Sequence, residues 1–148
     1  MLAILPPFLF APIAGYLVDK LDKEKILLNC ELLSFLSIFI GLTTYSLNYL
    51  NVFLISILVL FLATINEIRY TAFTASIPLL VDKEQIFSVN SILQSFRGGI
   101  IISAPMVSAF ILNHVGLFGI FITSLLAHSY ATYVAGKIKI NKTNDISH

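Results

Sequence analysis

The stretch GYLVDKLDKEKIL, Gly15 to Leu27, carries six charged residues in thirteen positions, whereas the sequence on both sides of it is almost entirely apolar. Three of these charges are lysines, at positions 20, 23 and 25. A short polar interruption between two long apolar segments is typical of the turn between two membrane-spanning helices. The stretch therefore predicts a helical membrane protein with this turn on one side of the bilayer.

The composition agrees with this interpretation. Of the 148 residues, 57% are hydrophobic and 11% are charged, and the mean hydropathy is +0.92. These values lie outside the range of ordinary water-soluble domains, so the lipid bilayer is the first expected partner. The net charge of +1 and the lack of a long basic run give no reason to expect a nucleic-acid partner. A single cysteine, Cys30, excludes an intrachain disulfide.

Five apolar segments are long enough, or nearly so, to cross a bilayer, which takes about 20 residues of helix. The predicted spans are residues 1–18, 26–47, 52–80, 90–112 and 117–135. The fold class is therefore all-α, a polytopic membrane helix bundle over residues 1–136, followed by a polar tail at 137–148. Pro6, Pro7 and Pro12 interrupt the first segment, which favours a kinked span over a secretory signal peptide.

The lysines predict the orientation of this bundle. They lie in the first polar break between spans, in the third break at Lys83, and in the tail. The second and fourth breaks contain neither Lys nor Arg. Five alternating spans place all these lysines on one side, which the positive-inside rule assigns to the cytoplasm. The prediction is a multi-pass protein of the plasma (inner) membrane with a cytoplasmic C-terminus. Its N-terminus would then lie outside, which suggests that a preceding helix is missing.

GYLVDKLDKEKIL resembles the loop between the second and third helices of major facilitator superfamily transporters, whose pattern is roughly G-x-L-x-D-R-x-x-R-x-R/K. The matching positions are Gly15, Leu17, Asp19, Lys20, Lys23 and Lys25. The resemblance implies that Asp19 is the acid of a gating loop, with Lys23 and Asp82 as ionic neighbours. Gly15 is expected to allow close helix approach.

Two later stretches extend the resemblance. TASIPLLVDKEQIFSVNSILQSF, residues 74–96, resembles the join between the fourth and fifth helices in the branch that includes macrolide and siderophore exporters. SAPMVSAF resembles the fifth-helix antiporter motif G-P-x-x-G-G and supplies a candidate helix-packing motif of Ser103, Ala104, Pro105 and Ser108. The resemblance implies that the chain covers about helices two to six of a twelve-helix transporter and is incomplete.

Small residues recur every four positions in the fourth predicted span. They are Ser91, Ser95, Gly99 and Ser103. Such a stripe on one helix face lets another helix backbone approach closely. Ordinary helix packing and a role in transport explain this stripe equally well.

Three ionisable residues lie well inside predicted spans: Glu67, Arg69 and Arg97. Each costs about 2.5 to 3.5 kcal/mol near the bilayer centre, so they should face a protein interior or a wet cavity. Counting along neighbouring helices gives Glu67 and Arg97 similar depths, which predicts an ion pair between them. Both a role in substrate or proton handling and a purely structural ion pair remain open for Glu67.

Polar residues around Glu67 suggest a cavity-lining helix face. They are Thr64, Asn66, Tyr70, Thr71 and Thr74. The resemblance also offers Arg69 as a coupling residue, because many proton-coupled members use an arginine in the fourth helix. Glu31 lies near the predicted cytoplasmic interface, where its side chain could snorkel to water.

The sequence contains no motif that predicts an enzyme, a cofactor or a metal site. It lacks G-x-S-x-G, H-E-x-x-H and P-loop patterns. His114, His128 and His148 lie too far apart in the predicted topology to form a metal centre, and His128 is expected to be a satisfied interior residue.

The sequence and the resemblance together predict a solute or drug efflux permease that works by alternating access. The substrate, a small molecule, cannot be read from the sequence. One half of a transporter would need its missing half or other membrane chains as partners. The alternatives are a non-transporting remnant of a transporter gene and a small membrane scaffold subunit.

Overall fold

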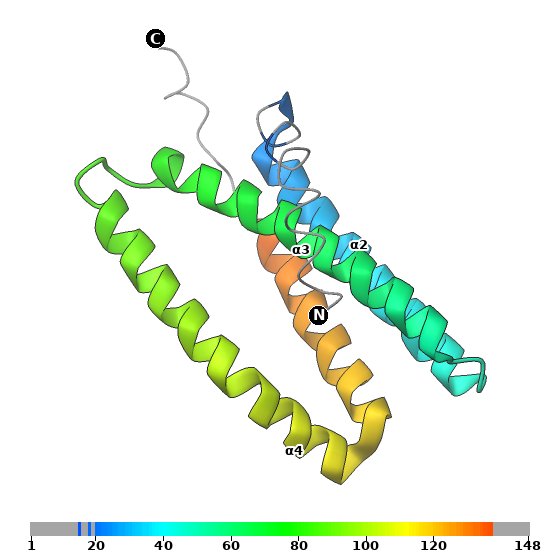
Figure 1. Cartoon of the computed structure of the whole chain (residues 1–148). Helices are drawn as coiled ribbons and strands as arrows, with labels where there is room; N and C mark the ends of the chain where they lie inside the picture. Colours follow the sequence, from blue (N-terminus) through cyan, green and yellow to red (C-terminus); the bar gives the residue numbers. More distant parts are fainter. Residues whose placement is uncertain (1–14, 16–17, 19, 138–148) are drawn as a thin grey trace.

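The computed structural model describes residues 15, 18 and 20–137 of the 148-residue chain, and this part is all-helical. Its long helices are α2 (Lys23–Ser46), α3 (Val52–Leu80) and α4 (Ile86–Ala135) (Figure 1). Each of the three is long and apolar enough to cross a membrane. The first predicted span falls almost wholly outside the described residues, as does the tail beyond Lys137.

A short turn, residues 47–51, joins α2 to α3. Asn48 takes a positive φ of 59°, a left-handed conformation that asparagine tolerates better than most residues. The side chain of Asn51 then accepts a hydrogen bond of 2.8 Å from the backbone N–H of Leu54. This cap satisfies one of the free N–H groups at the start of α3 and fixes where that helix begins.

α4 bends at Gly116, where φ is 76° and ψ is −171°. Only glycine adopts this combination readily, so the residue type permits the sharp change of direction seen in Figure 1. A straight helix of 50 residues would be about 75 Å long, more than twice the roughly 30 Å hydrocarbon core. We call residues 86–115 the first arm of α4 and residues 117–135 its second arm. The described part thus contains three membrane-length helices, and the predicted number of about five is not confirmed.

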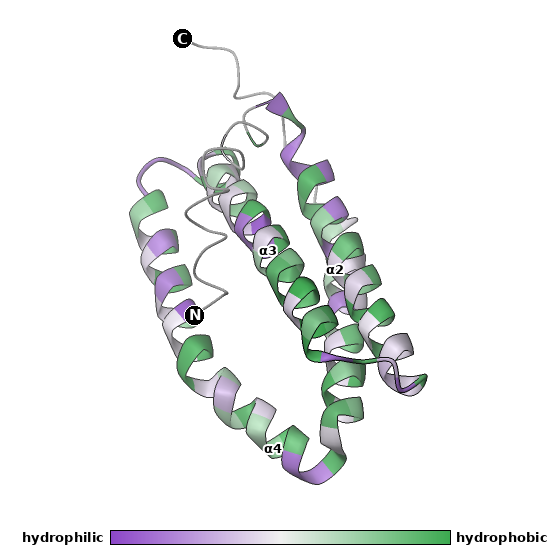
Figure 2. Ribbon diagram, turned by 45° about the vertical axis from the view of Figure 1, so that its right-hand side comes forward, coloured by the Kyte–Doolittle hydropathy of each residue, from purple (hydrophilic) through white to green (hydrophobic). Residues whose placement is uncertain are grey.

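α2 is the central helix of the described part, since it packs against both α3 and α4. Figures 1 and 2 show the second arm of α4 returning alongside α2, while the backbone of the first arm lies farther from α2. Close packing depends in part on Gly41 of α2, where a Cβ atom would come within 2.8 Å of the Phe121 ring. The buried core cluster consists of Val18, Ile26, Leu27, Cys30, Ile65 and Ala72.

Much of the helical surface is apolar and exposed, as expected for a protein solvated by lipid. Figure 2 shows hydrophobic residues over most of the helices, and hydrophilic residues at the loops and at some places along the helices, among them the first turns of α4. On the first arm of α4, Phe96, Ile102 and Phe110 are all more than 60% exposed. Apolar surface on this scale marks a face that lipid or other membrane helices cover.

The stripe of small residues lies on this exposed first arm. Ser91, Ser95, Gly99 and Ser103 are exposed, as are Ala104, Pro105 and Ser108 of the helix-packing motif. A Cβ atom at Gly99 would meet nothing within 4 Å. Within the described residues, no helix therefore takes the close approach that the stripe predicts.

Candidate functional site

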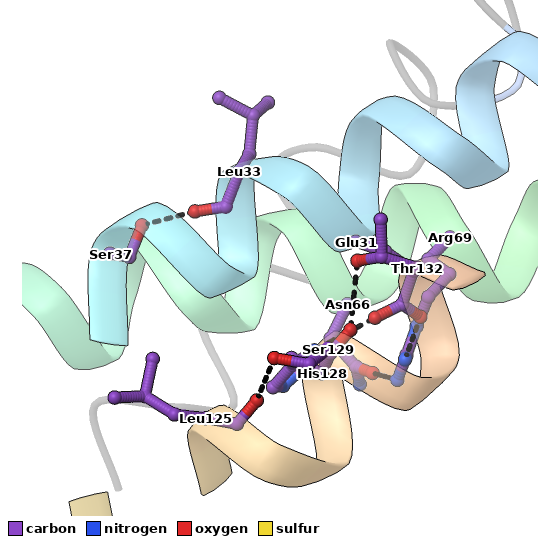
Figure 3. A network of polar contacts seen from close by, with 9 residues as sticks. All are labelled: Glu31, Leu33, Ser37, Asn66, Arg69, Leu125, His128, Ser129 and Thr132. Atoms are coloured by element: carbon purple, nitrogen blue, oxygen red, sulfur yellow. Dashed lines mark hydrogen bonds and ion pairs between the residues drawn. The ribbon is translucent and has the colours of Figure 1, made fainter. Parts of the chain in front are cut away.

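Glu31 of α2 is the meeting point of three helical segments. Its carboxylate oxygen Oε1 accepts a hydrogen bond of 2.6 Å from Arg69 Nη1 on α3. Its other oxygen, Oε2, lies 2.7 Å from Nδ1 of His128 on the second arm of α4. Because a carboxylate only accepts hydrogen bonds, the imidazole donates through Nδ1–H. Figure 3 shows the two partners approaching Glu31 from different helices.

Helical spacing explains why these side chains meet. Glu31 follows Leu27 by one turn, and Arg69 follows Ile65 by one turn, and both apolar residues belong to the buried core. Residues four positions apart share a helix face, so each charged group extends from a face that is already buried. The polar cluster is thus a continuation of the core and not a separate surface feature.

Further hydrogen bonds involve both partners of Glu31, through the side chain of Arg69 and the backbone of His128. Arg69 Nη2 donates to Asn66 Oδ1 at 2.6 Å, so the guanidinium is held from two sides. The Thr132 hydroxyl donates to the backbone carbonyl of His128 at 2.8 Å. We call Glu31, Asn66, Arg69 and His128 the Glu31 cluster. In it the carboxylate and the guanidinium compensate each other's charge, which makes ionised groups tolerable inside a membrane bundle.

The prediction that the Glu31 side chain reaches water at the membrane interface is wrong. Its residue exposure is 6%, and its carboxylate is occupied on both oxygens, so its side chain does not snorkel to water. The sequence signal that was missed is the set of small residues that follow Glu31 on α2. Ser34, Ser37 and Gly41 recur at helical spacing after it, and these small buried residues mark the face on which other helices pack.

The predicted ion pair between Glu67 and Arg97 is also wrong. The Arg97 guanidinium carbon lies 4.0 Å from the centroid of the Tyr70 ring, a cation–π contact. Gln94, one turn before Arg97, donates through Nε2 to the Tyr70 hydroxyl at 3.0 Å. The prediction used only the depth of each residue along its helix, which does not say toward which neighbour the side chain points. In the structure the side chains of Arg97 and Gln94 reach Tyr70 of α3.

A cavity of about 750 Å³ lies between α2, α3 and both arms of α4. Of the candidate residues, Arg69 and Arg97 line it and Glu67 does not. Three of the polar residues around Glu67 that were expected to line a cavity do so: Asn66, Tyr70 and Thr74. The remaining polar and charged lining residues are Glu31, Asn90, Gln94 and Tyr130, and the other walls are apolar.

The charged loop before α2 is described only in part. Asp19 lies outside the described residues, so its role and its proposed ionic neighbours Lys23 and Asp82 remain predictions. At Gly15 a Cβ atom would meet nothing within 4 Å, so the described residues do not contain the expected close approach. Lys20 is exposed and Lys23 begins α2.

No group of three or more His, Cys, Asp or Glu side chains in residues 20–137 is arranged to hold a metal ion. His128 makes its contact with the carboxylate of Glu31. The chemistry that the described site offers is recognition by charge, hydrogen bonding and apolar contact.

Comparisons with known proteins give the family. The sequence model of a family described as transmembrane secretion effector matches residues 1–145. Macrolide efflux protein A of Streptococcus pyogenes is 29% identical over 146 residues, which are 98% of this chain and 36% of that protein. The protein of the same name from Enterococcus faecalis is also 29% identical over 98% of this chain, which covers 45% of its length. No solved structure matches.

The chain thus spans less than half of the length of these relatives, and the match extends over nearly all of the chain itself. The resemblance to major facilitator transporters, which rested on three short motifs, is confirmed by the family match. This membrane protein belongs to the transmembrane secretion effector family of the major facilitator superfamily.

Proposed function

We propose that the chain takes part in the efflux of an amphiphilic small molecule across the plasma membrane. The observation that carries this proposal is the open cavity lined by α2, α3 and both arms of α4. Its volume of about 750 Å³ is within the range of small-molecule sites. The names of the two relatives make macrolides the first substrate class to test. We assign transport and no catalysis to the chain.

The lining of the cavity suits an amphiphilic solute. Phe73, Phe96 and Ile100 supply apolar surface, and Arg69 and Arg97 supply charge. Binding sites for small molecules typically combine a mostly apolar wall with a few polar groups that fix orientation. A solute with both an apolar body and a polar group would use both parts of this lining.

Alternating access in this superfamily requires two halves that rock about a central site. Because the relatives are more than twice as long as the chain, the second half would come from further sequence or from another membrane chain. Residues 15–27 and the antiporter-like residues 103–108 would then work against that second half. The exposed apolar first arm of α4 is surface on which such a partner could pack.

Five spans with a cytoplasmic C-terminus remain part of the proposal. The bend at Gly116 supports it, because each arm of α4 can then cross the bilayer separately. The end of α4 lies beside the first turns of α2, where Ala135 and Leu27 line the same cavity. This arrangement supports the proposal that the lysine-bearing start of α2 and the end of α4 lie on one side of the membrane.

Single cysteines test this orientation. In a Cys30→Ala background, Tyr49→Cys tests the α2–α3 turn and Glu84→Cys tests the α3–α4 turn; both positions are exposed. A membrane-impermeant maleimide should label position 49 in intact cells and position 84 only after permeabilisation. The reverse pattern would overturn the proposed orientation.

The transport test measures accumulation of a radiolabelled macrolide in bacteria that lack their own macrolide exporters. The chain is expressed alone, and together with the part of the Enterococcus faecalis relative that it does not cover. Efflux should lower accumulation at least twofold in one of these strains. Arg97→Gln, which alters the charge of the cavity lining, should change the size of the decrease, and Lys83→Gln, which removes a charge in the exposed α3–α4 turn, should not.

Unchanged accumulation would count against macrolide efflux, and protein levels then separate the alternatives. A stable chain that co-purifies with a defined membrane protein would indicate a scaffold subunit. A chain that is degraded in every strain would indicate a remnant without transport activity.

A further inference from the structure

Arg97 carries a charge that no acid compensates within the described residues. Asp22 pairs with Lys25, and Glu31 pairs with Arg69 and His128, so neither of these acids compensates Arg97. The contact of Arg97 is with the face of the Tyr70 ring at 4.0 Å, which leaves the N–H groups at the edge of the guanidinium available. Arg97 lines the cavity, so these donors are accessible to a ligand there.

The charge balance of the cavity lining follows from the same contacts. The lining contains one acidic residue, Glu31, and two arginines, Arg69 and Arg97. Arg69 compensates Glu31 at 2.6 Å, which leaves the charge of Arg97 as an excess of one positive charge. A ligand that carries one negative charge would neutralise this excess by pairing with the exposed guanidinium of Arg97.

Neighbouring side chains extend the positive group into a set of donors. Gln94 and Asn90 precede Arg97 at helical spacing on the first arm of α4, and both line the cavity. Their carboxamides can donate hydrogen bonds to the oxygens of an anionic group. Arginine is well suited to such recognition because its planar fork can bind a carboxylate, sulfonate or phosphate through two parallel hydrogen bonds.

The depth of Arg97 argues for a solute and against a lipid headgroup as the source of the anion. Arg97 is eleven residues beyond Ile86, the first residue of α4, which corresponds to about 16 Å along the helix. Counted instead from residue 90, where the predicted span begins, the depth is about 10 Å, a third of the roughly 30 Å hydrocarbon core, and both values place Arg97 inside that core. Phosphates of bilayer lipids lie outside that core, so a ligand that reaches Arg97 has entered the cavity.

We infer that the cavity binds a small amphiphilic anion, with its acidic group on Arg97 and its apolar body against Phe73, Phe96 and Ile100. The inference rests on the proposed efflux function and assigns to the same cavity a substrate class, acidic amphiphiles, that differs in charge from the basic macrolides suggested by the names of the relatives. It concerns binding alone, and a direct binding measurement therefore tests it even if transport of macrolides fails.

The test uses two fluorescent probes that differ in one acidic group. They are 1-anilinonaphthalene-8-sulfonate, an anion, and N-phenyl-1-naphthylamine, its neutral counterpart. Each is titrated into the chain in nanodiscs of phosphatidylcholine, with empty nanodiscs subtracted. Arg97→Gln should weaken binding of the sulfonate at least tenfold and that of the neutral probe less than twofold. Arg97→Lys should retain part of the affinity for the sulfonate, and Lys83→Gln should leave the binding of both probes unchanged.

Three results would overturn the inference. The first is equal weakening of both probes by Arg97→Gln at unchanged helical circular dichroism, which would indicate a general change of the cavity. The second is sulfonate binding that does not depend on Arg97. The third is loss of the sulfonate's Arg97-dependent binding in nanodiscs with phosphatidylglycerol, which would assign the site to a lipid headgroup.

Discussion

The imidazole Nδ1 of His128 lies 2.7 Å from the carboxylate oxygen Oε2 of Glu31, a residue 97 positions earlier in the chain. The contact ties the second arm of α4 to α2. Since Arg69 occupies the other oxygen of the same carboxylate, one side chain connects all three helices of the described part. The stability of this arrangement should therefore be unusually sensitive to changes at Glu31.

Glu31→Gln removes the negative charge and leaves Arg69 without compensation. Loss of one member of a buried ion pair costs roughly 3 to 5 kcal/mol, and because Arg69 is partly exposed we expect about 3 kcal/mol. The measurement is unfolding of the chain in detergent micelles, followed by circular dichroism. Glu84→Gln, in the exposed α3–α4 turn, is the matched control and should change stability by less than about 0.5 kcal/mol. Equal effects of the two changes would contradict a special role for Glu31.

His128→Ala should loosen the second arm of α4 selectively. It removes a hydrogen bond to a charged acceptor, which contributes about 1.5 to 3 kcal/mol. Amide hydrogen exchange should become faster in residues 117–135 and stay unchanged in the first arm. His128→Asn, whose side-chain amide can donate near the position of Nδ1, should retain much of the protection. Faster exchange over the whole chain would instead indicate global destabilisation.

Gly116→Ala tests the bend of α4. The φ of 76° and ψ of −171° at this position suit glycine, and a residue with a Cβ atom pays about 1 to 3 kcal/mol there. Gly99→Ala is the matched change within the helical first arm, where a Cβ atom meets nothing within 4 Å. It should be neutral or stabilise by up to about 1 kcal/mol. Unfolding of both variants in the same detergent gives the comparison, and a similar small effect at both positions would argue against a strained bend.

Gly41→Ala tests the contact between α2 and the second arm of α4. The new Cβ atom would lie 2.8 Å from Cε1 of Phe121, so the ring or the helix must move. Such overpacking costs about 1 to 3 kcal/mol. Phe121→Leu should relieve the clash, so the double variant should be more stable than the sum of the two single changes predicts. A double-mutant cycle of unfolding free energies measures this coupling.

The sequence predicted the features that depend on composition and local order. Apolar length identified membrane helices, and the motif around Asp19 led to the superfamily that the family match confirms. Features that depend on rotation of one helix against another were not predicted correctly. Residue counting placed Arg97 beside Glu67 and left Glu31 in water, whereas Arg97 reaches Tyr70 and Glu31 is buried. Helix axes can be rotated without changing a hydropathy profile, so such pairings require the packed structure.

The backbone torsion angles of Gly116 also set the position of the whole first arm of α4. Arg97 is nineteen residues before Gly116 on a continuous helical arm, at a distance of about 28 Å along the axis. A rotation of only about 10° at the φ and ψ of Gly116 would displace Arg97 by roughly 5 Å, about the rise of one helical turn. The position of the guanidinium relative to Tyr70 and the Glu31 cluster thus depends on two backbone torsion angles at one glycine.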